Sequence, residues 1–304
     1  MLTLRERLAR PRPTLTYRIE GLQARGHRAL LAAQFKVGKT TVVANVTRSL
    51  LDGDAFLGRY AVAPIDGTLM VLDFEMAEAQ LDEWYEDQHV VHDDRLILVP
   101  MKGRAASFDL TDPNVRSCWV AALKARGVTY LILDCLRPVL DALGLNEHTQ
   151  AGVFLTALDT LLYEAGIAEA LVVHHMGHDK KRARGDSRIL DWPDAVWSLD
   201  GKQDSKAPRF FHAIGRDVTV PKSQLAYDSK TRRLSLRSKT SAALTDVLSA
   251  LKAGPLSQNA IEKKLAGELH SRQSIRDALI EGVRLGVLKW KSGPKHAILW
   301  ELDT

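Results

Sequence analysis

Cysteine is scarce in this chain of 304 residues, which contains only Cys118 and Cys135. Two thiols cannot build a disulfide framework, and neither thiol belongs to a paired spacing of the kind that holds structural zinc. The sequence therefore argues against a small disulfide-stabilised secreted domain and against a cysteine-rich zinc module. A reducing cytoplasm is the expected location.

Long apolar runs and a strong charge imbalance are also missing. No apolar run approaches the ~18 residues that a membrane-spanning helix needs. The first ten residues, MLTLRERLAR, are charged and lack the apolar segment of a signal peptide. The net charge of +5, from 42 Lys and Arg against 37 Asp and Glu, is too small to identify an anionic partner by itself. We expect a globular protein with no membrane partner.

A phosphate-binding sequence lies near the N-terminus. Residues 33–40 read AQFKVGKT and lie between an apolar run, 28–33, and a helical pattern, 39–51. A strand, a tight loop and a helix in this order are the setting of the P-loop motif G-x-x-x-x-G-K-[ST], whose first Gly is replaced here by Ala33. Gly38 allows the backbone N–H groups to turn inward, and the start of the helix attracts an anion. The chain is expected to bind a nucleoside triphosphate.

The residue types of this loop predict individual roles. Lys39 is expected to contact the β and γ phosphates, and the Thr40 hydroxyl to ligate Mg²⁺. The predicted nucleotide-binding residues are Gln34, Phe35, Lys36, Val37, Gly38, Lys39, Thr40 and Thr41. ATP and Mg²⁺ are the cofactors that this segment implies.

Two later apolar runs end in carboxylates. VTYLILD ends at Asp134, and LMVLDFEM carries Asp73 and Glu75. Ligands bind at the carboxyl ends of strands in open α/β sheets, so Asp134 is the candidate Walker B residue that helps to hold Mg²⁺. Period-two alternation places Asp73 and Glu75 on one side of their strand. Either acid could orient the water that attacks the γ-phosphate.

Apolar strand-like runs alternate with helical patterns from about residue 15 to 238, which predicts an α/β domain with a mostly parallel sheet and an antiparallel far edge. The expected strands are 28–33, 68–74, 95–99, 129–134, 170–175, 195–199, 209–214 and 233–237. The expected helices among them include 39–51, 76–88, 113–126 and 151–165. We assign 1–17 to an N-terminal arm, 18–238 to the ATPase domain and 239–304 to a second, smaller domain.

The C-terminal domain has a different pattern. Helices are expected at 243–252, from the cap Ser257 to about 265, and from the cap Ser271 to about 285, and a hairpin follows them. Three helices and a hairpin are the order of a winged helix. Residues 229–304 hold 14 Lys and Arg against 7 Asp and Glu. Arg272 and Arg276 lie on the polar face of the third helix and are the candidate contacts to duplex DNA.

The position of Glu75 indicates a resemblance to one particular family of ATPases. A catalytic glutamate in the strand after the P-loop helix is typical of RecA-type ATPases, and Phe74-Glu75-Met76 looks like the Leu-Glu-Met of hexameric replicative helicases of the DnaB kind. Residues 18–216 resemble the RepA-type plasmid helicases and related plasmid and phage ATPases. The resemblance implies a RecA-like fold, a homo-oligomeric and hexameric ring, and single-stranded DNA as partner. It also implies that Glu75 is the catalytic carboxylate and Asp73 a structural neighbour.

The resemblance implies three further roles. The second histidine of LVVHHMGH would be a γ-phosphate sensor, which selects His175 and places His174 under the sheet, although the reverse assignment stays open. The basic segment 178–188 would face the central pore and bind the backbone of a single strand; a merely solvated loop is the alternative. Its candidate contacts are Lys180, Lys181, Arg182 and Arg184. Arg216 would reach a neighbouring subunit's γ-phosphate, with Arg184 as the rival.

Two functions follow from these features. The first is an ATP-hydrolysing, ring-forming motor on single-stranded DNA in plasmid, phage or mobile-element replication. The second is a DNA-binding initiator, loader or regulator that uses ATP as an assembly switch with little unwinding. The tryptophans at 84, 119, 192 and 197 are interpreted as core or interface residues, because nothing marks them as base-stacking.

Overall fold

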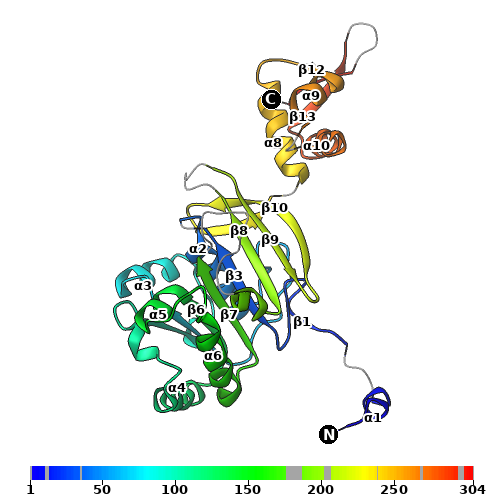
Figure 1. The fold of residues 1–304 in the computed structure, drawn as a ribbon. Coiled ribbons are helices and arrows are strands. Elements are labelled where there is room, and N and C mark those ends of the chain that lie inside the picture. Colours follow the sequence, from blue (N-terminus) through cyan, green and yellow to red (C-terminus); the bar gives the residue numbers. More distant parts are fainter. Residues whose placement is uncertain are drawn as a thin grey trace. The chain divides into compact units, whose positions relative to one another are not determined.

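The computed structural model describes residues 2–10, 14–34, 36–175, 187–201, 207–237, 239–267, 270–293 and 298–303. The chain forms two compact units, Met1–Leu236 and Arg237–Thr304 (Figure 1). The division falls in the polar segment where the sequence pattern changes. No helix among the described residues is long and apolar enough to cross a membrane.

The first unit is built on strands that alternate with helices along the chain. Its strands are β1 (Tyr17–Ile19), β2 (Gln23–Ala24), β3 (Arg28–Ala33), β4 (Thr68–Asp73), β5 (Leu96–Pro100), β6 (Val128–Asp134), β7 (Glu169–His175), β8 (Ala195–Asp200), β9 (Arg209–Gly215), β10 (Thr219–Asp228) and β11 (Arg233–Leu236). Its α-helices are α1 (Leu4–Leu8), α2 (Lys39–Asp52), α3 (Glu78–Glu86), α4 (Pro113–Ala125), α5 (Leu136–Ala142), α6 (Ala151–Ala165) and α7 (Ser187–Asp191).

A nine-stranded sheet with the order β11-β10-β9-β8-β3-β7-β6-β4-β5 forms the centre of this unit. The strands from β8 to β5 in this order are parallel, and β9, β10 and β11 add to the β8 side in antiparallel fashion. The predicted α/β class, with a parallel centre and an antiparallel edge, is therefore confirmed. Because parallel strands all end at the same edge, the residues that follow β3, β4, β6 and β7 meet there.

Alternation along the strands divides the core between the two faces of the sheet. On β3, Leu31 packs in one cluster with α2 and α3, while Leu30 packs in the other with α4, α5 and α6. The same alternation separates Ile132 from Leu133 on β6 and continues along β4 and β7. A residue's place in this alternation therefore decides whether its side chain lies on the α2 face.

The strand β10 was not expected from the sequence. It pairs with β9 on one side and with β11 on the other, but it contains Pro221, which cannot donate to a ladder. The proline falls inside a register shift between Val220 and Ser223, where the β9 ladder is interrupted. An irregular strand of this kind has no clean apolar alternation, so its partners rather than its local pattern define it.

The second unit contains three α-helices and a small antiparallel sheet in its described part. These elements are α8 (Lys239–Leu251), β12 (Leu256–Ser257), α9 (Gln258–Leu265), α10 (Arg272–Arg284), β13 (Leu288–Ser292) and β14 (Ile298–Leu302), with the sheet order β12-β14-β13. Ser257 and Ser271 accept the backbone N–H bonds expected of helix caps. A separate apolar core holds this unit together. The winged-helix assignment, which rests on this element order, stays a prediction.

Replacement of Leu158 by Ala tests the packing of α6 on the sheet. Leu158 is fully buried, whereas Val153 on the same helix is 52% exposed. We expect Leu158→Ala to lower the free energy of unfolding by about 2–5 kcal/mol, because it leaves a cavity in the core. Val153→Ala is the matched control and should change it by less than about 0.5 kcal/mol. Urea denaturation monitored by circular dichroism measures both; equal losses would contradict the orientation of the helix.

Candidate functional site

The carboxyl edge of the parallel strands brings the predicted polar residues together. Asp73 on β4, Asp134 on β6 and His175 on β7 follow the alternation of the residues that pack against α2, so all three belong to the α2 face. The loop between β3 and α2 ends at this edge. The sheet thus places residues from widely separated segments around one phosphate-binding loop.

The loop itself has the backbone that a phosphate cradle requires. Gly38 caps α2 with φ of 101°, a left-handed conformation that a side chain disfavours, and Lys36 also has positive φ, 59°. The N–H of Val42 bonds back to the carbonyl of Gly38 and begins the helix. Val37 is fully buried and does not belong to the lining of the site. Gln34 directly follows β3, and Phe35 lies outside the described residues.

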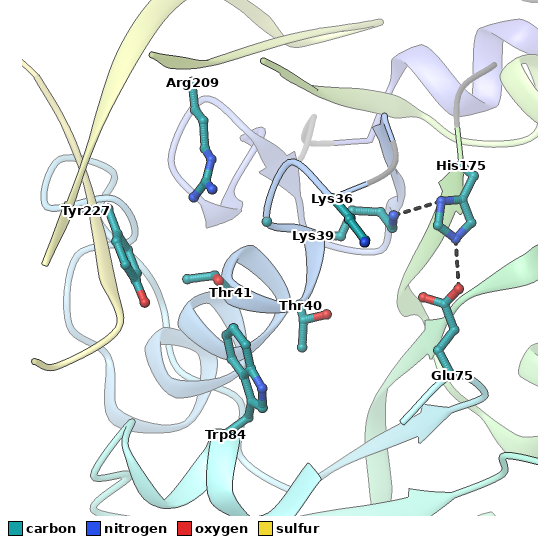
Figure 2. Close-up of a pocket in the computed structure, with 10 residues that line it drawn as sticks. Lys36, Lys39, Thr40, Thr41, Glu75, Trp84, His175, Arg209 and Tyr227 are labelled. Atoms are coloured by element: carbon teal, nitrogen blue, oxygen red, sulfur yellow. Dashed lines mark hydrogen bonds and ion pairs between the residues drawn. The ribbon is translucent and has the colours of Figure 1, made fainter. Parts of the chain in front are cut away.

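A chain of hydrogen bonds joins the P-loop to the acidic turn after β4 (Figure 2). Lys39 Nζ lies 2.8 Å from His175 Nδ1, and His175 Nε2 lies 2.9 Å from Glu75 Oε1. The ammonium can only donate, so Nδ1 accepts and the ring proton of a neutral imidazole sits on Nε2. That proton is donated to the Glu75 carboxylate. The three side chains therefore define each other's protonation and orientation.

The pKa shifts of this chain follow from its burial and contacts. Burial lowers the pKa of Lys39, and the nearby Glu75 carboxylate opposes that shift. The hydrogen bond from His175 lowers the pKa of Glu75, with burial acting in the opposite direction. Glu75 is therefore ionised at neutral pH, which is the form that can orient and polarise a water molecule.

Asp73 shapes the turn that carries Glu75. Its Oδ1 accepts the backbone N–H of Glu75 at 2.8 Å and that of Met76 at 2.7 Å. Burial raises the pKa of Asp73, and the two backbone bonds counteract the shift. The residue is 2% exposed. Its contacts fit the structural role that the sequence resemblance implied, because it fixes the backbone on which Glu75 is held.

Asp134 and Thr40 fit the requirements of a Mg²⁺ site. Asp134 is 3% exposed, and its Oδ1 has no hydrogen-bond partner among the described residues. Burial, reinforced by Asp73 and Glu75, raises the pKa of Asp134 to about 8. A buried oxygen without a partner is costly, and a cation would remove that cost and favour the ionised form. Thr40 lines a cavity beside the P-loop, so its hydroxyl can supply a second oxygen.

A cavity of about 400 Å³ opens beside the P-loop. Its lining residues are Lys36, Gly38, Lys39, Thr40, Thr41, Glu75, Trp84, His175, Arg209 and Tyr227. His175 and Glu75 lie on one side of the loop, and Arg209 and Tyr227 on the other (Figure 2). Lysine, arginine and threonine side chains thus lie at the P-loop end of the cavity, and the rings of Trp84 and Tyr227 line the remainder.

Arg209, Trp84 and Tyr227 were not identified from the sequence as site residues. A methyl group placed on Gly38 would lie 3.4 Å from an Arg209 terminal nitrogen, so the guanidinium covers the P-loop. Its buried Nε has no hydrogen-bond partner among the described residues. Trp84, which the sequence suggested to be a core or interface residue, lies in the wall of the cavity. The Arg232 guanidinium lies 4.3 Å from the centre of its ring. No local motif marks these residues, because α3, β9 and β10 meet the loop only in the folded chain.

The paired histidines face opposite sides of the sheet. His174 is buried, and its Nε2 lies 3.2 Å from Glu147 Oε1, away from the cavity. His175 lies in the cavity. Adjacent residues of a strand point in opposite directions, so only one of the two can reach the phosphate site. The structure places His175 there.

Among the other predicted residues, Arg216 does not belong to the lining of this cavity. Arg216 directly follows β9 at the end opposite Arg209; its side chain is 78% exposed and lies 3.7 Å from Asp194. Arg276 forms a 2.9 Å ion pair with the buried Glu262, and Arg272 lies 3.9 Å from the same carboxylate. Lys180, Lys181, Arg182 and Arg184 lie outside the described residues.

Arg209→Ala tests whether the guanidinium above the P-loop binds phosphate. We expect the Kd for a non-hydrolysable ATP analogue to rise about tenfold, because a charge-assisted hydrogen bond is lost. Arg126→Ala, at an exposed arginine that caps the C-terminal end of α4, is the control and should leave the Kd within about twofold. Isothermal titration calorimetry measures both constants. Equal affinities of wild type and Arg209→Ala would exclude Arg209 from the binding site.

Comparisons with known proteins agree with this site. A family model described as AAA domain matches residues 2–181. Among solved structures, the KaiC-like protein of the hyperthermophilic archaeon Pyrococcus horikoshii OT3 is similar, with a TM-score of 0.52 and 16% identity over 74% of this chain and 99% of that one. Such an identity shows the fold alone, which is RecA-like. No curated protein matches the chain. The match over more than half of the sequence shows that the chain belongs to the AAA domain family of P-loop ATPases.

Proposed function

We propose that this ATPase forms a homo-oligomeric ring, hexameric by its resemblance, and uses ATP hydrolysis to move on single-stranded DNA. The observation that carries the proposal is the hydrogen-bonded chain Lys39–His175–Glu75. It joins the residue that would contact phosphate to the acid that would activate water. His175 is also the last residue of β7, and the basic segment 178–188 begins three residues later in the sequence.

Glu75 is the residue that we assign to water activation. Its carboxylate is ionised and fixed by His175 on one side and by the Asp73-supported turn on the other. Lys39 would bind the terminal phosphates, and Arg209 would contact them from across the loop. Mg²⁺, held by Thr40 and Asp134, would neutralise the charge that develops on the phosphate oxygens. The rings of Trp84 and Tyr227 would form an apolar wall against the nucleoside.

His175 would report the presence of phosphate. In the structure, Lys39 donates to His175. A phosphate in the loop would compete for the same ammonium, and His175 Nδ1 would then lose its donor. The imidazole can rotate or accept a new partner only when that bond is broken. The orientation of His175 at the end of β7 would therefore differ between the nucleotide-bound and the free site. A ligand shifts a conformational equilibrium only through such differential contacts.

The DNA part of the proposal rests on the sequence of residues 178–188 and on the family resemblance. The segment reads HDKKRARGDSR and begins three residues after His175, the last residue of β7. Its cations Lys180, Lys181, Arg182 and Arg184 would pair with phosphates of a single strand. Arg216 remains our proposal for the arginine contributed by a neighbouring subunit, since its exposed side chain is available for a contact in trans.

A second function is supported by the independent C-terminal unit. Residues 237–304 have their own core and could bind duplex DNA while ATP controls assembly. Arg272 and Arg276 remain substantially exposed, and Glu262 holds Arg276 in place. In this alternative, α10 would enter the major groove and hydrolysis would drive little unwinding.

Glu75→Gln tests the assignment of the catalytic carboxylate. The amide keeps the shape but cannot accept a proton, so we expect turnover to fall by about 100-fold or more while ATP still binds. Steady-state phosphate release and ATP binding measure the two effects. Glu78→Gln, an exposed acid in the first turn of α3, is the control and should keep the wild-type rate. Normal turnover by Glu75→Gln would require another residue as base.

Simultaneous replacement of Lys180, Lys181 and Arg182 by Ala tests the DNA-contacting segment. We expect weaker binding of a labelled single strand and a slope of log K against log salt that is smaller by about 2, because three phosphate contacts are lost at ~0.7 each. Fluorescence anisotropy at several salt concentrations gives both. The paired variant Arg272→Ala/Arg276→Ala should leave single-strand binding unchanged. Loss of binding only in that second variant would favour the ATP-switched alternative.

A further inference from the structure

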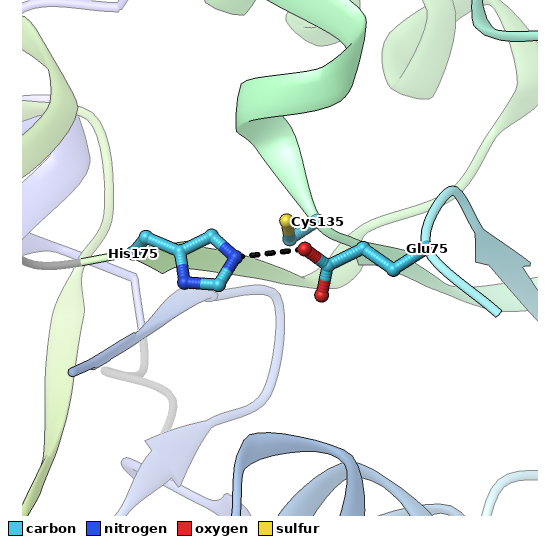
Figure 3. Close-up of side chains that lie close together, drawn as sticks. All are labelled: Glu75, Cys135 and His175. Carbon is cyan, nitrogen blue, oxygen red and sulfur yellow. Dashed lines mark hydrogen bonds and ion pairs between the residues drawn. The ribbon is translucent and has the colours of Figure 1, made fainter. Parts of the chain in front are cut away.

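Three side chains of different chemistry converge at the edge of the sheet (Figure 3). Glu75, Cys135 and His175 each offer one ligand atom, and these atoms lie within 4.8 Å of one another. They follow or end the neighbouring strands β4, β6 and β7. Because β6 lies between the other two strands in the sheet, Cys135 lies beside the hydrogen bond that joins the carboxylate to the imidazole. The convergence is thus a consequence of strand order.

We propose that Glu75, Cys135 and His175 form a binding site for a thiophilic divalent cation such as Zn²⁺, separate from the Mg²⁺ position at Thr40 and Asp134. A thiolate, an imidazole and a carboxylate are the donors that zinc prefers. Magnesium instead requires oxygen donors in octahedral geometry, so a sulfur ligand selects against it. The inference about metal binding does not depend on the proposed motor function.

The observed distances suit this cation after small movements. In a tetrahedral zinc site with bonds of about 2.0–2.3 Å, ligand atoms stand roughly 3.3–3.6 Å apart. His175 Nε2 and Glu75 Oε1 are 2.9 Å apart and need to separate by a few tenths of an ångström. The sulfur lies within 4.8 Å of both atoms and would have to approach each of them to about 3.5 Å in such a site. The Glu75 side chain is 40% exposed and provides the entrance from the cavity.

Metal binding would rearrange the protons of the Lys39–His175–Glu75 chain. The Cys135 thiol releases its proton to solvent and binds as thiolate. His175 keeps one ring proton, which moves from Nε2 to Nδ1 when Nε2 binds the cation. Nδ1 can then no longer accept from Lys39, so the metal and the observed 2.8 Å hydrogen bond exclude each other. The cation also holds Glu75, the residue that would activate water.

The consequence for activity rests on the proposed function of Glu75. A cation at this site would block hydrolysis by withdrawing both His175 and Glu75, whereas the loop residues that bind phosphate would remain accessible. The predicted effect is inhibition of turnover with little change in nucleotide affinity. Such a site would make the ATPase sensitive to zinc.

The two cysteines of the chain allow a matched test of binding. Cys135 is buried at the site, and Cys118 is exposed on α4, outside it. Full-length wild type, Cys118→Ser and Cys135→Ser are titrated with Co²⁺ in the absence of nucleotide, and the near-ultraviolet cobalt–thiolate absorption is recorded. We expect one equivalent to produce the band in wild type and Cys118→Ser but not in Cys135→Ser. No band in wild type, or an equal band in Cys135→Ser, would overturn the proposal.

A second variant keeps the test valid if Cys135→Ser does not fold, which circular dichroism reveals. Glu75→Gln retains both thiols and should weaken Co²⁺ binding at least tenfold, since a neutral amide replaces a carboxylate ligand. Unchanged affinity would remove Glu75 from the site and contradict the proposal.

Inhibition of ATP turnover by Zn²⁺ separates this proposal from the proposed function. We expect Zn²⁺ to inhibit wild type and Cys118→Ser alike and to inhibit Cys135→Ser at least tenfold more weakly, each relative to its own rate. Binding of zinc to ATP affects all three proteins equally at one ATP concentration, and Cys118→Ser controls for the loss of a thiol outside the site. A cobalt band without inhibition would support the metal site and contradict the role of Glu75 in hydrolysis.

Discussion

The hydrogen bond from the Lys39 ammonium to His175 is the interaction on which the rest of the site depends. Lys39 is 7% exposed, and a cation withdrawn from water needs compensation. His175 supplies an acceptor, and the Glu75 carboxylate behind it supplies charge. The same bond fixes the His175 tautomer with its proton on Nε2, and Nε2 donates that proton to the Glu75 carboxylate. Binding of phosphate to Lys39 would break this hydrogen bond. The orientation of His175 would then depend on whether nucleotide is bound.

Strand order and alternation explain why these residues meet. The P-loop strand β3 pairs with β7, β7 with β6, and β6 with β4, so their ends line up along one edge. Alternation selects the face: Asp73, Asp134 and His175 lie toward α2, whereas His174 lies on the opposite face beside Glu147. The two histidines, although adjacent in sequence, therefore belong to different environments. A shift of one residue in the register of β7 would exchange them.

Much of this architecture could be predicted from the sequence because it depends on local patterns. The apolar runs that end at Asp73, Asp134 and His175 are nearly unbroken, as expected of parallel strands buried on both faces, and the order of strand, loop and helix around Gly38 is itself a motif. What the sequence did not indicate comes from non-local contacts. Arg209 lies at the start of an antiparallel strand and Trp84 in the middle of α3, and neither has a spacing that relates it to the P-loop. The strand β10 was missed because Pro221 interrupts its pattern.

We infer that the nucleotide site is coupled through His175 to the segment that would carry DNA. Steady-state ATP hydrolysis with and without single-stranded DNA, at a low and a high salt concentration, tests this coupling most directly. We expect DNA to stimulate hydrolysis several-fold at low salt and less at high salt, because phosphate contacts are screened and counterions compete. A rate that is the same with and without DNA at both salt concentrations would contradict it.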